Sequence, residues 1–270
     1  MLIGNINRIP YALPYASQAA EYDVPAGEQR LSDYPDLEIW MQPDQGNVIA
    51  PSPNLAIASR FGGYAFTAKG AGTFVTTDLT EAVEVVQFPV GAPTGSEPLR
   101  AEGYNLGGDY VLCGLFRFDD AADMSSTVHT LFSAGIDGTA SKVQVYALGG
   151  SLIVRHNATD CARTGVFSAG EEYLVMITFD AATGDCKAYV NSTVELGWSS
   201  ENALAAAGGD DALAIGGRWI AGKAKGAQIM DGVCRAAWAG RAPWGMSRYD
   251  TVRTSFLTEV AGLYSDITLA

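Results

Sequence analysis

The stretch KVQVYALGGSLIVRH, residues 142–156, decides the fold. Polar and apolar side chains alternate over residues 142–146, which gives a strand one wet face and one dry face. The Leu-Gly-Gly-Ser-Leu sequence at 148–152 is typical of a hairpin turn, and a second apolar run follows it. This stretch therefore predicts two antiparallel strands joined by a tight turn.

Short apolar runs separated by Gly, Pro, Asn and Asp continue in both directions from this hairpin. The runs predict eleven strands, at 37–41, 55–59, 83–88, 110–118, 128–133, 142–148, 151–156, 173–179, 186–190, 212–216 and 229–238. Their even spacing, without helices between them, favours an all-β, antiparallel jelly-roll sandwich. We expect one sandwich domain at 32–270, preceded by an extended arm at 1–31.

A single helix is predicted near the C-terminus. Ser247 is placed to cap it, with Asp250 three residues later in a capping-box-like pair. The apolar face that follows at helical spacing consists of Val252, Phe256, Leu257 and Val260, and Gly262 and Tyr264 end the helix. We expect this face to cover an edge of the sandwich.

The first thirty residues follow neither pattern. Prolines at 10, 14 and 25 favour extended backbone. The large side chains among them are Tyr11, Leu13, Tyr15 and Tyr22. Such an arm docks either on a neighbouring subunit or on its own domain. We recognise neither a signal peptide nor a transmembrane stretch, and expect synthesis in the cytoplasm.

Charge narrows the possible partners. The chain carries 30 acidic and 17 basic residues, for a net charge of −13. No run of Lys and Arg is long enough to form a basic stripe, which argues against nucleic acid and against anionic membranes as partners. The acidity itself favours solubility.

The cysteines are widely spaced and form no metal-binding motif. Cys113 and Cys234 lie in apolar runs and are expected to be buried. Cys161 and Cys186 are either bridged or reduced, and the sequence leaves both alternatives open. A zinc site is disfavoured because the chain has only two histidines, His129 and His156.

The order of these motifs resembles a known superfamily. The segments that carry the resemblance are LEIWMQPD at 37–44, TLFSAG at 130–135, VQVY at 143–146, LGGSLIV at 148–154, GEEYLVMITFD at 170–180, GDCKAYVN at 184–191, AIGG at 214–217 and GAQIMD at 226–231. Together they are similar to laminin-G-like domains of the concanavalin A-like lectin/glucanase superfamily, of the type found in bacteriophage virion proteins. The resemblance implies a jelly-roll sandwich, and its members include lectins, glycosidases, adhesion modules and virion proteins.

Glycoside hydrolysis requires two opposed carboxylates. Glucanases that share this fold carry them as Glu-x-Asp-x-Glu or Glu-x-Asp-x-x-Glu, and the nearest pairs here, Asp36/Glu38 and Glu81/Glu84, match neither string. No Ser or Cys nucleophile motif accompanies either histidine. We expect a protein that is not an enzyme and that has no bound cofactor.

Two kinds of binding site are conceivable on such a sandwich. Calcium, which some superfamily members bind, would need oxygen ligands. The candidates are Asp137, Asp160, Asp210 and Asp211, although Asp is also common in turns. A glycan would need an exposed aromatic ring beside polar groups, which favours Trp219 with Arg218. Trp238 and Trp244 are expected to pack the last strand against the helix.

These expectations favour a structural protein of a virus particle, most simply a tailed phage, as a capsid decoration or a tail component. It would assemble in the host cytoplasm as a homo-oligomer with other virion proteins, docking through its arm. The alternative is a carbohydrate-binding adhesion module that recognises a surface glycan. A glycan hydrolase or lyase is the third hypothesis.

Overall fold

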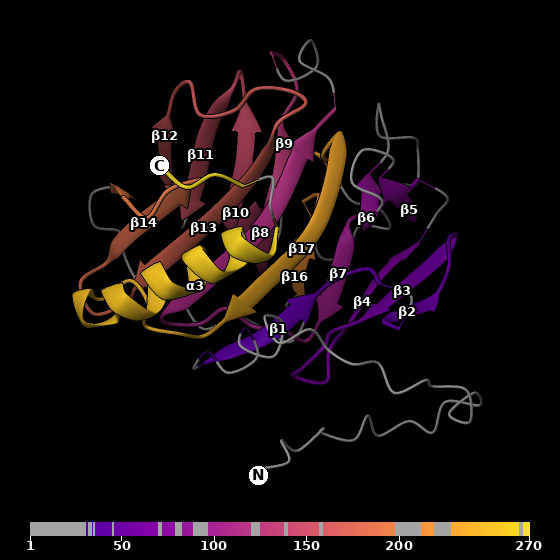
Figure 1. The fold of residues 1–270 in the computed structure, drawn as a ribbon, viewed down its shortest axis with the longest axis horizontal. Helices are drawn as coiled ribbons and strands as arrows, with labels where there is room; N and C mark the ends of the chain where they lie inside the picture. The colour runs from indigo at the N-terminus through magenta and orange to yellow at the C-terminus, as the bar shows by residue number, and fades with distance from the viewer. Residues whose placement is uncertain are drawn as a thin grey trace.

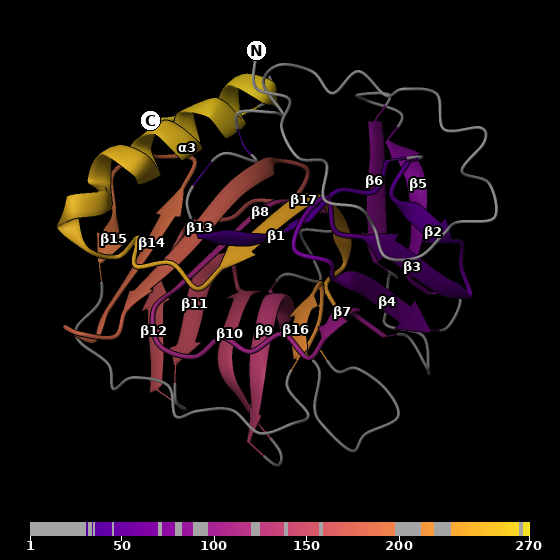
Figure 2. The ribbon, with the colours of Figure 1, turned by 90° about the horizontal axis from the view of Figure 1, so that it is seen from below.

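The computed structural model describes residues 31, 34, 36–44, 46–69, 72–78, 83–88, 97–119, 125–137, 140–156, 159–197, 212–218, 228–264 and 267–270. Two antiparallel sheets stack face to face, and one helix lies on the outside of the stack (Figures 1 and 2). The predicted all-β jelly-roll sandwich with a C-terminal helix is confirmed.

The eight-stranded sheet carries the helix. In spatial order its strands are β15 (Leu196–Gly197), β14 (Asp185–Val190), β13 (Glu172–Asp180), β8 (Tyr110–Phe118), β17 (Gly232–Gly240), β6 (Val83–Phe88) and β5 (Phe74–Asp78), and β1 (Leu37–Met41) also pairs with β17. The start of β17 pairs with β6 and its end with β1, so both strands lie along the same side of β17.

The nine-stranded sheet forms the opposite layer. Its order is β12 (Thr159–Arg163), β11 (Ser151–His156), β10 (Ala140–Leu148), β9 (His129–Asp137), β16 (Ala212–Ile215), β7 (Leu99–Glu102), β4 (Ala65–Lys69), β3 (Asn54–Ala58) and β2 (Val48–Ala50). The hairpin predicted from 142–156 is β10 and β11, with Leu148 paired to Ser151 across the turn. Gly149 and Gly150 have φ of 60° and 70°, which explains the choice of glycine in this tight turn.

The main core fills the space between the sheets. The alternation in β10 sends Val143, Val145 and Ala147 into it, where all three are fully buried. The eleven predicted strands correspond to β1, β3, β6, β8, β9, β10, β11, β13, β14, β16 and β17, with differences of a few residues at some ends. The strands β2, β4, β5, β7, β12 and β15 were not predicted.

The helix α3 (Asp250–Leu263) covers a face of the sandwich. In Figure 2 it lies on the outer side of the eight-stranded sheet, away from the other layer. Phe256, Leu257 and Val260 are buried there together with Trp40 of β1 and Trp238 of β17. The prediction that the helix covers an edge is therefore wrong, because the outward side chains of several central strands are themselves apolar and need cover.

The start of the helix also differs from the prediction. Ser247 belongs to a 3₁₀ turn, η1 (Ser247–Tyr249), and α3 begins at Asp250 without a side-chain cap. Asp250 instead pairs with the guanidinium of Arg253 one turn later. Arg253 in turn donates to the carbonyl of Trp244, so an ion pair between a buried guanidinium and an exposed carboxylate stands where the cap was predicted.

None of the four cysteines forms a disulfide. Cys113 and Cys234 are buried as predicted, and burial raises the pKa of both thiols. Cys161 lies on β12 and Cys186 on β14, in different sheets, and they are not bridged. Among the described helical residues, no segment is long and apolar enough to cross a membrane.

Candidate functional site

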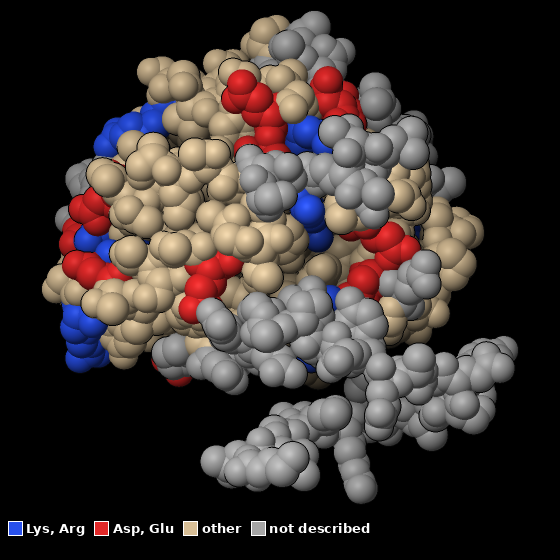
Figure 3. Space-filling view, viewed as in Figure 1, with Lys and Arg blue, Asp and Glu red and all other residues tan. Residues whose placement is uncertain are grey.

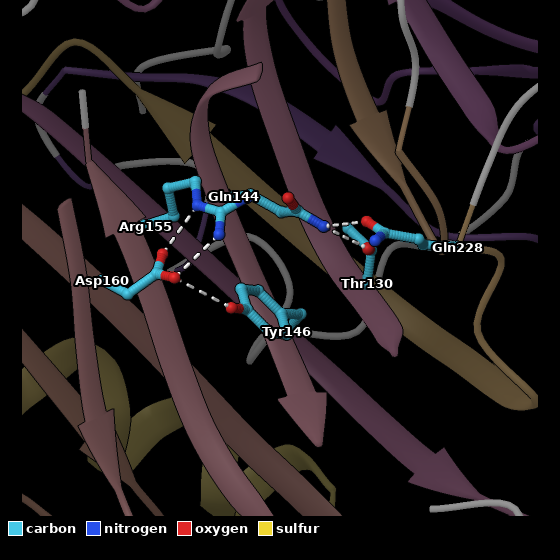
Figure 4. Close-up of polar contacts among 6 residues, drawn as sticks. All are labelled: Thr130, Gln144, Tyr146, Arg155, Asp160 and Gln228. Carbon is cyan, nitrogen blue, oxygen red and sulfur yellow. Dashed lines mark hydrogen bonds and ion pairs between the residues drawn. The ribbon is translucent and has the colours of Figure 1, made fainter. Parts of the chain in front are cut away.

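The outer face of the nine-stranded sheet carries polar side chains from several strands. Cross-strand register places Arg155 of β11 beside both Gln144 of β10 and Asp160 of β12. On the other side of β10, Tyr146 pairs with Thr130 of β9. Because side chains of one strand alternate between faces, all five share the face opposite to the core (Figure 4).

An ion pair forms the exposed part of this face. The guanidinium of Arg155 donates from Nε to Asp160 Oδ1 at 2.6 Å and from Nη2 to Oδ2 at 2.7 Å. The two side chains keep 29% and 40% of their surface exposed. Tyr146 donates its hydroxyl to Asp160 Oδ2 at 3.4 Å, and the Arg155 guanidinium carbon lies 5.9 Å from the centre of its ring.

The pair is electrostatically tight. Hydrogen bonding to Asp160 raises the pKa of Arg155, so the guanidinium stays charged. Burial, and then the negative charge of Asp160, raise the pKa of the Tyr146 hydroxyl, which therefore stays a hydrogen-bond donor at neutral pH. The pair thus places guanidinium donors and carboxylate acceptors side by side, which suits ligands whose hydroxyls both donate and accept.

A buried amide network lies next to the ion pair. Gln144 is 1% exposed and donates from Nε2 to Thr130 Oγ1 at 2.8 Å and to Gln228 Oε1 at 2.6 Å (Figure 4). The backbone N–H of Thr130 donates to the carbonyl of Gln228 at 3.2 Å. Gln228, which precedes β17 by a few residues, is thereby attached to β9 and β10 through its backbone and its side chain.

Arg218 lies beside this face. It follows Gly217, whose carbonyl accepts a hydrogen bond from Ser133 of β9 at 3.1 Å. Burial lowers the pKa of the half-buried Arg218, and the positive charge of Arg155 lowers it further, so the two guanidinium groups are within electrostatic range. The predicted glycan contact Arg218 therefore lies near the ion pair, whereas its predicted companion Trp219 is outside the described residues.

The calcium candidates have other surroundings or lie outside the described part of the chain. Both carboxylate oxygens of Asp160 bind Arg155, so this residue takes part in an ion pair. Asp210, Asp211 and the side chain of Asp137 are among the residues that the structure does not describe. Within the described ranges, no group of three or more His, Cys, Asp or Glu side chains is placed to hold a metal ion.

Of the residues weighed for catalysis, Glu38 is held in an ion pair and both histidines are buried, and those weighed for docking lie outside the described residues. Glu38 binds Arg241 through both carboxylate oxygens at 2.8–3.0 Å, and Asp36 enters β1 with a left-handed φ of 67°. Both histidines, His129 and His156, are buried. Glu81 and the arm residues Tyr11, Leu13, Tyr15 and Tyr22 lie outside the described residues.

The prediction for the C-terminal tryptophans is confirmed. The ring of Phe256 in α3 lies 5.7 Å from that of Trp238 and 5.3 Å from that of Trp244. Both indoles are fully buried, so neither is available to a ligand.

Sequence reasoning missed most of the site. Gln144 and Tyr146 were identified only as the wet positions of a strand, and Arg155 was not singled out. The usable signal was the hairpin itself, because Arg155 and Asp160 flank a short connection and so meet across it. Gln228 had no such signal, since it reaches Gln144 from 84 positions away.

The sequence matches no known family model and no curated protein. Solved structures share the fold. A sialidase from Trypanosoma rangeli superposes with a TM-score of 0.54 at 10% identity, over 83% of this chain and 33% of that one. The binding domain of Paraclostridial Mosquitocidal Protein 1 superposes with a TM-score of 0.54 at 10% identity, over 84% of this chain and 53% of that one.

These likenesses establish a class of fold. The chain spans about a third of the sialidase and about half of the mosquitocidal binding domain. At such low identity they confirm the β-sandwich fold and leave the superfamily, the ligand and the activity unassigned.

Proposed function

We propose that this chain is a carbohydrate-binding module whose binding surface is the outer face of the nine-stranded sheet. The observation that carries the proposal is the partly exposed Arg155–Asp160 pair, backed by Tyr146 and adjacent to Arg218. Sugar hydroxyls need donors and acceptors in a fixed arrangement, and this pair supplies both. The shared fold of a toxin's binding domain and of a sialidase solved with sialic acid is compatible with this role.

The surrounding structure favours such a role because it fixes the pair in advance. Asp160 is held from two sides, by Arg155 and by the Tyr146 hydroxyl. A ligand that binds an ordered pair does not have to bear the entropic cost of immobilising these side chains. We propose that Trp219, next to Arg218 in the sequence, adds the aromatic contact that sugar rings favour.

A glycan array followed by calorimetric titration tests this proposal. We expect Arg155→Met to weaken binding of the best glycan at least about 10-fold, because a bound hydroxyl loses an ionic hydrogen bond worth roughly 1.5–3 kcal/mol. Trp219→Ala should abolish detectable binding. The matched control is Lys187→Met, which breaks the Lys187–Glu195 contact of 2.9 Å on β14, in the other sheet, and should leave binding unchanged.

Two outcomes would contradict the proposal. One is an array without any signal above background for the folded wild-type protein. The other is a glycan whose affinity is the same for wild type and Arg155→Met, with circular dichroism showing that both are folded.

A second proposal is a structural role in a virus particle, which would depend on the N-terminal arm. Its structural support is the root of the arm: Leu31 is fully buried, and the ring of Tyr34 lies 5.1 Å from that of Phe256. We propose that residues 1–30, which lie outside the described residues, dock on a neighbouring subunit. Deleting residues 1–30 should then lower the oligomeric mass seen by light scattering while glycan binding persists.

The enzymatic alternative is tested separately. Release of reducing ends from β-glucans and acidic polysaccharides by the full chain would identify a hydrolase or lyase. We expect no release, because Glu38, one of the carboxylates weighed for that chemistry, is held in an ion pair by Arg241.

A further inference from the structure

The segment from Gln228 to Asp231 is attached to the first two residues of β9 and to the neighbouring strand β10. Outward, Gln228 binds the Gln144 amide, as described above. Inward, the backbone N–H of Asp231 donates to Nδ1 of His129 at 3.0 Å. Between them, the N–H of Met230 donates to the carbonyl of Gly216 at 2.9 Å, two residues before Arg218.

The inward attachment depends on the charge state of the histidine. His129 is fully buried, with its ring edge against Phe118 of β8 at 5.8 Å. A ring nitrogen that accepts a hydrogen bond carries no proton, whereas both nitrogens of a protonated imidazole are donors. The bond from the Asp231 N–H therefore exists only while His129 is neutral.

The segment is also held in a conformation that it would not adopt alone. Gln228 has a φ of 52°, in the left-handed region that residues other than glycine rarely occupy. Such conformations persist where surrounding contacts enforce them. Loss of the Asp231–His129 hydrogen bond would therefore allow Gln228 to leave its left-handed conformation.

We infer that His129 is a positioning residue for the proposed glycan face, and that its protonation in acid releases the Gln228–Asp231 segment. The inference rests on the proposed function for its consequence, which is that Gln228 and Arg218 shift together and that glycan affinity falls in acid. A change at His129 can reach the site because His129 faces the core while its neighbour Thr130 faces the site.

Charged groups at this corner come from two elements. Asp231 itself has a buried carboxylate, and Asp119 at the end of β8 donates its N–H to the Asp231 carbonyl at 3.3 Å. Arg117 lies 3.9 Å from Asp119. The residue that β10 pairs with His129 is Ala147, which is uncharged. The charged side chains nearest to this attachment are therefore two carboxylates and one guanidinium.

Amide hydrogen exchange tests the inference directly. We expect the wild-type amides of Asp231 and Met230 to lose about 10-fold of their protection, corrected for intrinsic exchange, between about pH 7.5 and about pH 5. In His129→Asn the side-chain oxygen accepts in place of Nδ1 at every pH, so protection should stay constant. His156→Asn is the matched control, since His156 is the other buried histidine and contacts Tyr110; it should keep the wild-type pH dependence.

Two results would overturn the inference: wild-type protection that does not change with pH, or a His129→Asn protein that changes as wild type does. Should His129→Asn fail to fold, nitrogen NMR of the wild-type imidazole decides the matter, because a protonated Nδ1 at neutral pH contradicts the assigned bond. The exchange readout uses no glycan. If the binding proposal fails, no glycan binds but amide protection still depends on pH. If this inference fails, a glycan binds but amide protection does not depend on pH.

Discussion

The two sheets of this sandwich share one core, but the outer face of one is apolar and that of the other carries polar side chains. The eight-stranded sheet turns tryptophan, leucine, methionine and cysteine outward and buries them under α3. The nine-stranded sheet turns glutamine, threonine, tyrosine, arginine and aspartate outward. The face seen in Figure 3, with α3 in front, carries its charges in small groups among large areas without them.

This difference indicates that the two outer faces contribute differently to the stability of the fold. Apolar area that is removed from water stabilises the fold by about 25 cal/mol per Å², which makes the covered face a second core. The polar face gains little stability from its exposed ion pair, since such pairs are worth about 0–1 kcal/mol. The proposed glycan binding would give this arrangement a role that stability does not. Each prediction below tests that contrast.

Trp238→Ala should give the largest effect, a loss of about 4 kcal/mol in the free energy of unfolding. Trp238 is fully buried and its ring lies 5.9 Å from Trp40 and 5.7 Å from Phe256, so truncation opens a cavity at the centre of the second core. Chemical denaturation measures the loss. Trp238→Phe is the control and should lose less, because it keeps an aromatic ring in the cluster. A change below about 1 kcal/mol for Trp238→Ala would show that the covered face is not a core.

Two ion pairs allow the faces to be compared with the same chemistry. Arg235 and Glu172 meet at 3.1 Å on the helix-bearing sheet, with only 10% and 9% of their side chains exposed. Glu172→Gln leaves a buried guanidinium without its carboxylate and should cost about 3 kcal/mol of stability. Asp160→Asn removes the matching charge from the partly exposed pair on the nine-stranded sheet and should cost less than about 1 kcal/mol.

The informative quantity is the ratio of these two losses, read from parallel denaturation curves. Glycan titration supplies the other half of the comparison, because Asp160→Asn should weaken binding and Glu172→Gln should not. Equal stability losses, or equal effects on binding, would remove the distinction between the faces.

The sequence was sufficient to predict the strands whose apolar side chains recur at regular spacing. Strands such as β8 and β13 are long, apolar and bounded by turns, so their pattern is strong. The missed strands are short or polar: β7 reads LRAE, β12 reads TDCAR and β15 has two residues. β7 pairs with β16, which is distant in sequence, whereas β12 and β15 pair with the strands directly before them but carry too weak an apolar pattern to be recognised.

The position of the helix and most of the site depended on tertiary contacts. An apolar helical face shows that something is covered, but residues 256–260 do not show whether it is an edge or a face of a sheet. Arg218 was predicted from its aromatic neighbour in sequence. Its proximity to Arg155 depends on the path of β16 past β9, which local pattern does not contain.

The smallest predicted effect tests whether α3 and the sandwich unfold as one unit. Gly262 lies in the last turn of α3 with nothing within 4 Å of where a Cβ would be, so Gly262→Ala raises helix propensity without new contacts. The expected gain is about 0.5 kcal/mol in the free energy of unfolding, below the roughly 1 kcal/mol of a mid-helix site because helix ends fray. Thr258→Gly, at an exposed position one turn earlier, should lower stability by a similar amount. Global unfolding reports these changes only if α3 stays docked until the sheets separate. Unchanged denaturation midpoints for both variants, with altered helicity by circular dichroism, would mean that the helix leaves first and that the second core is a separable layer.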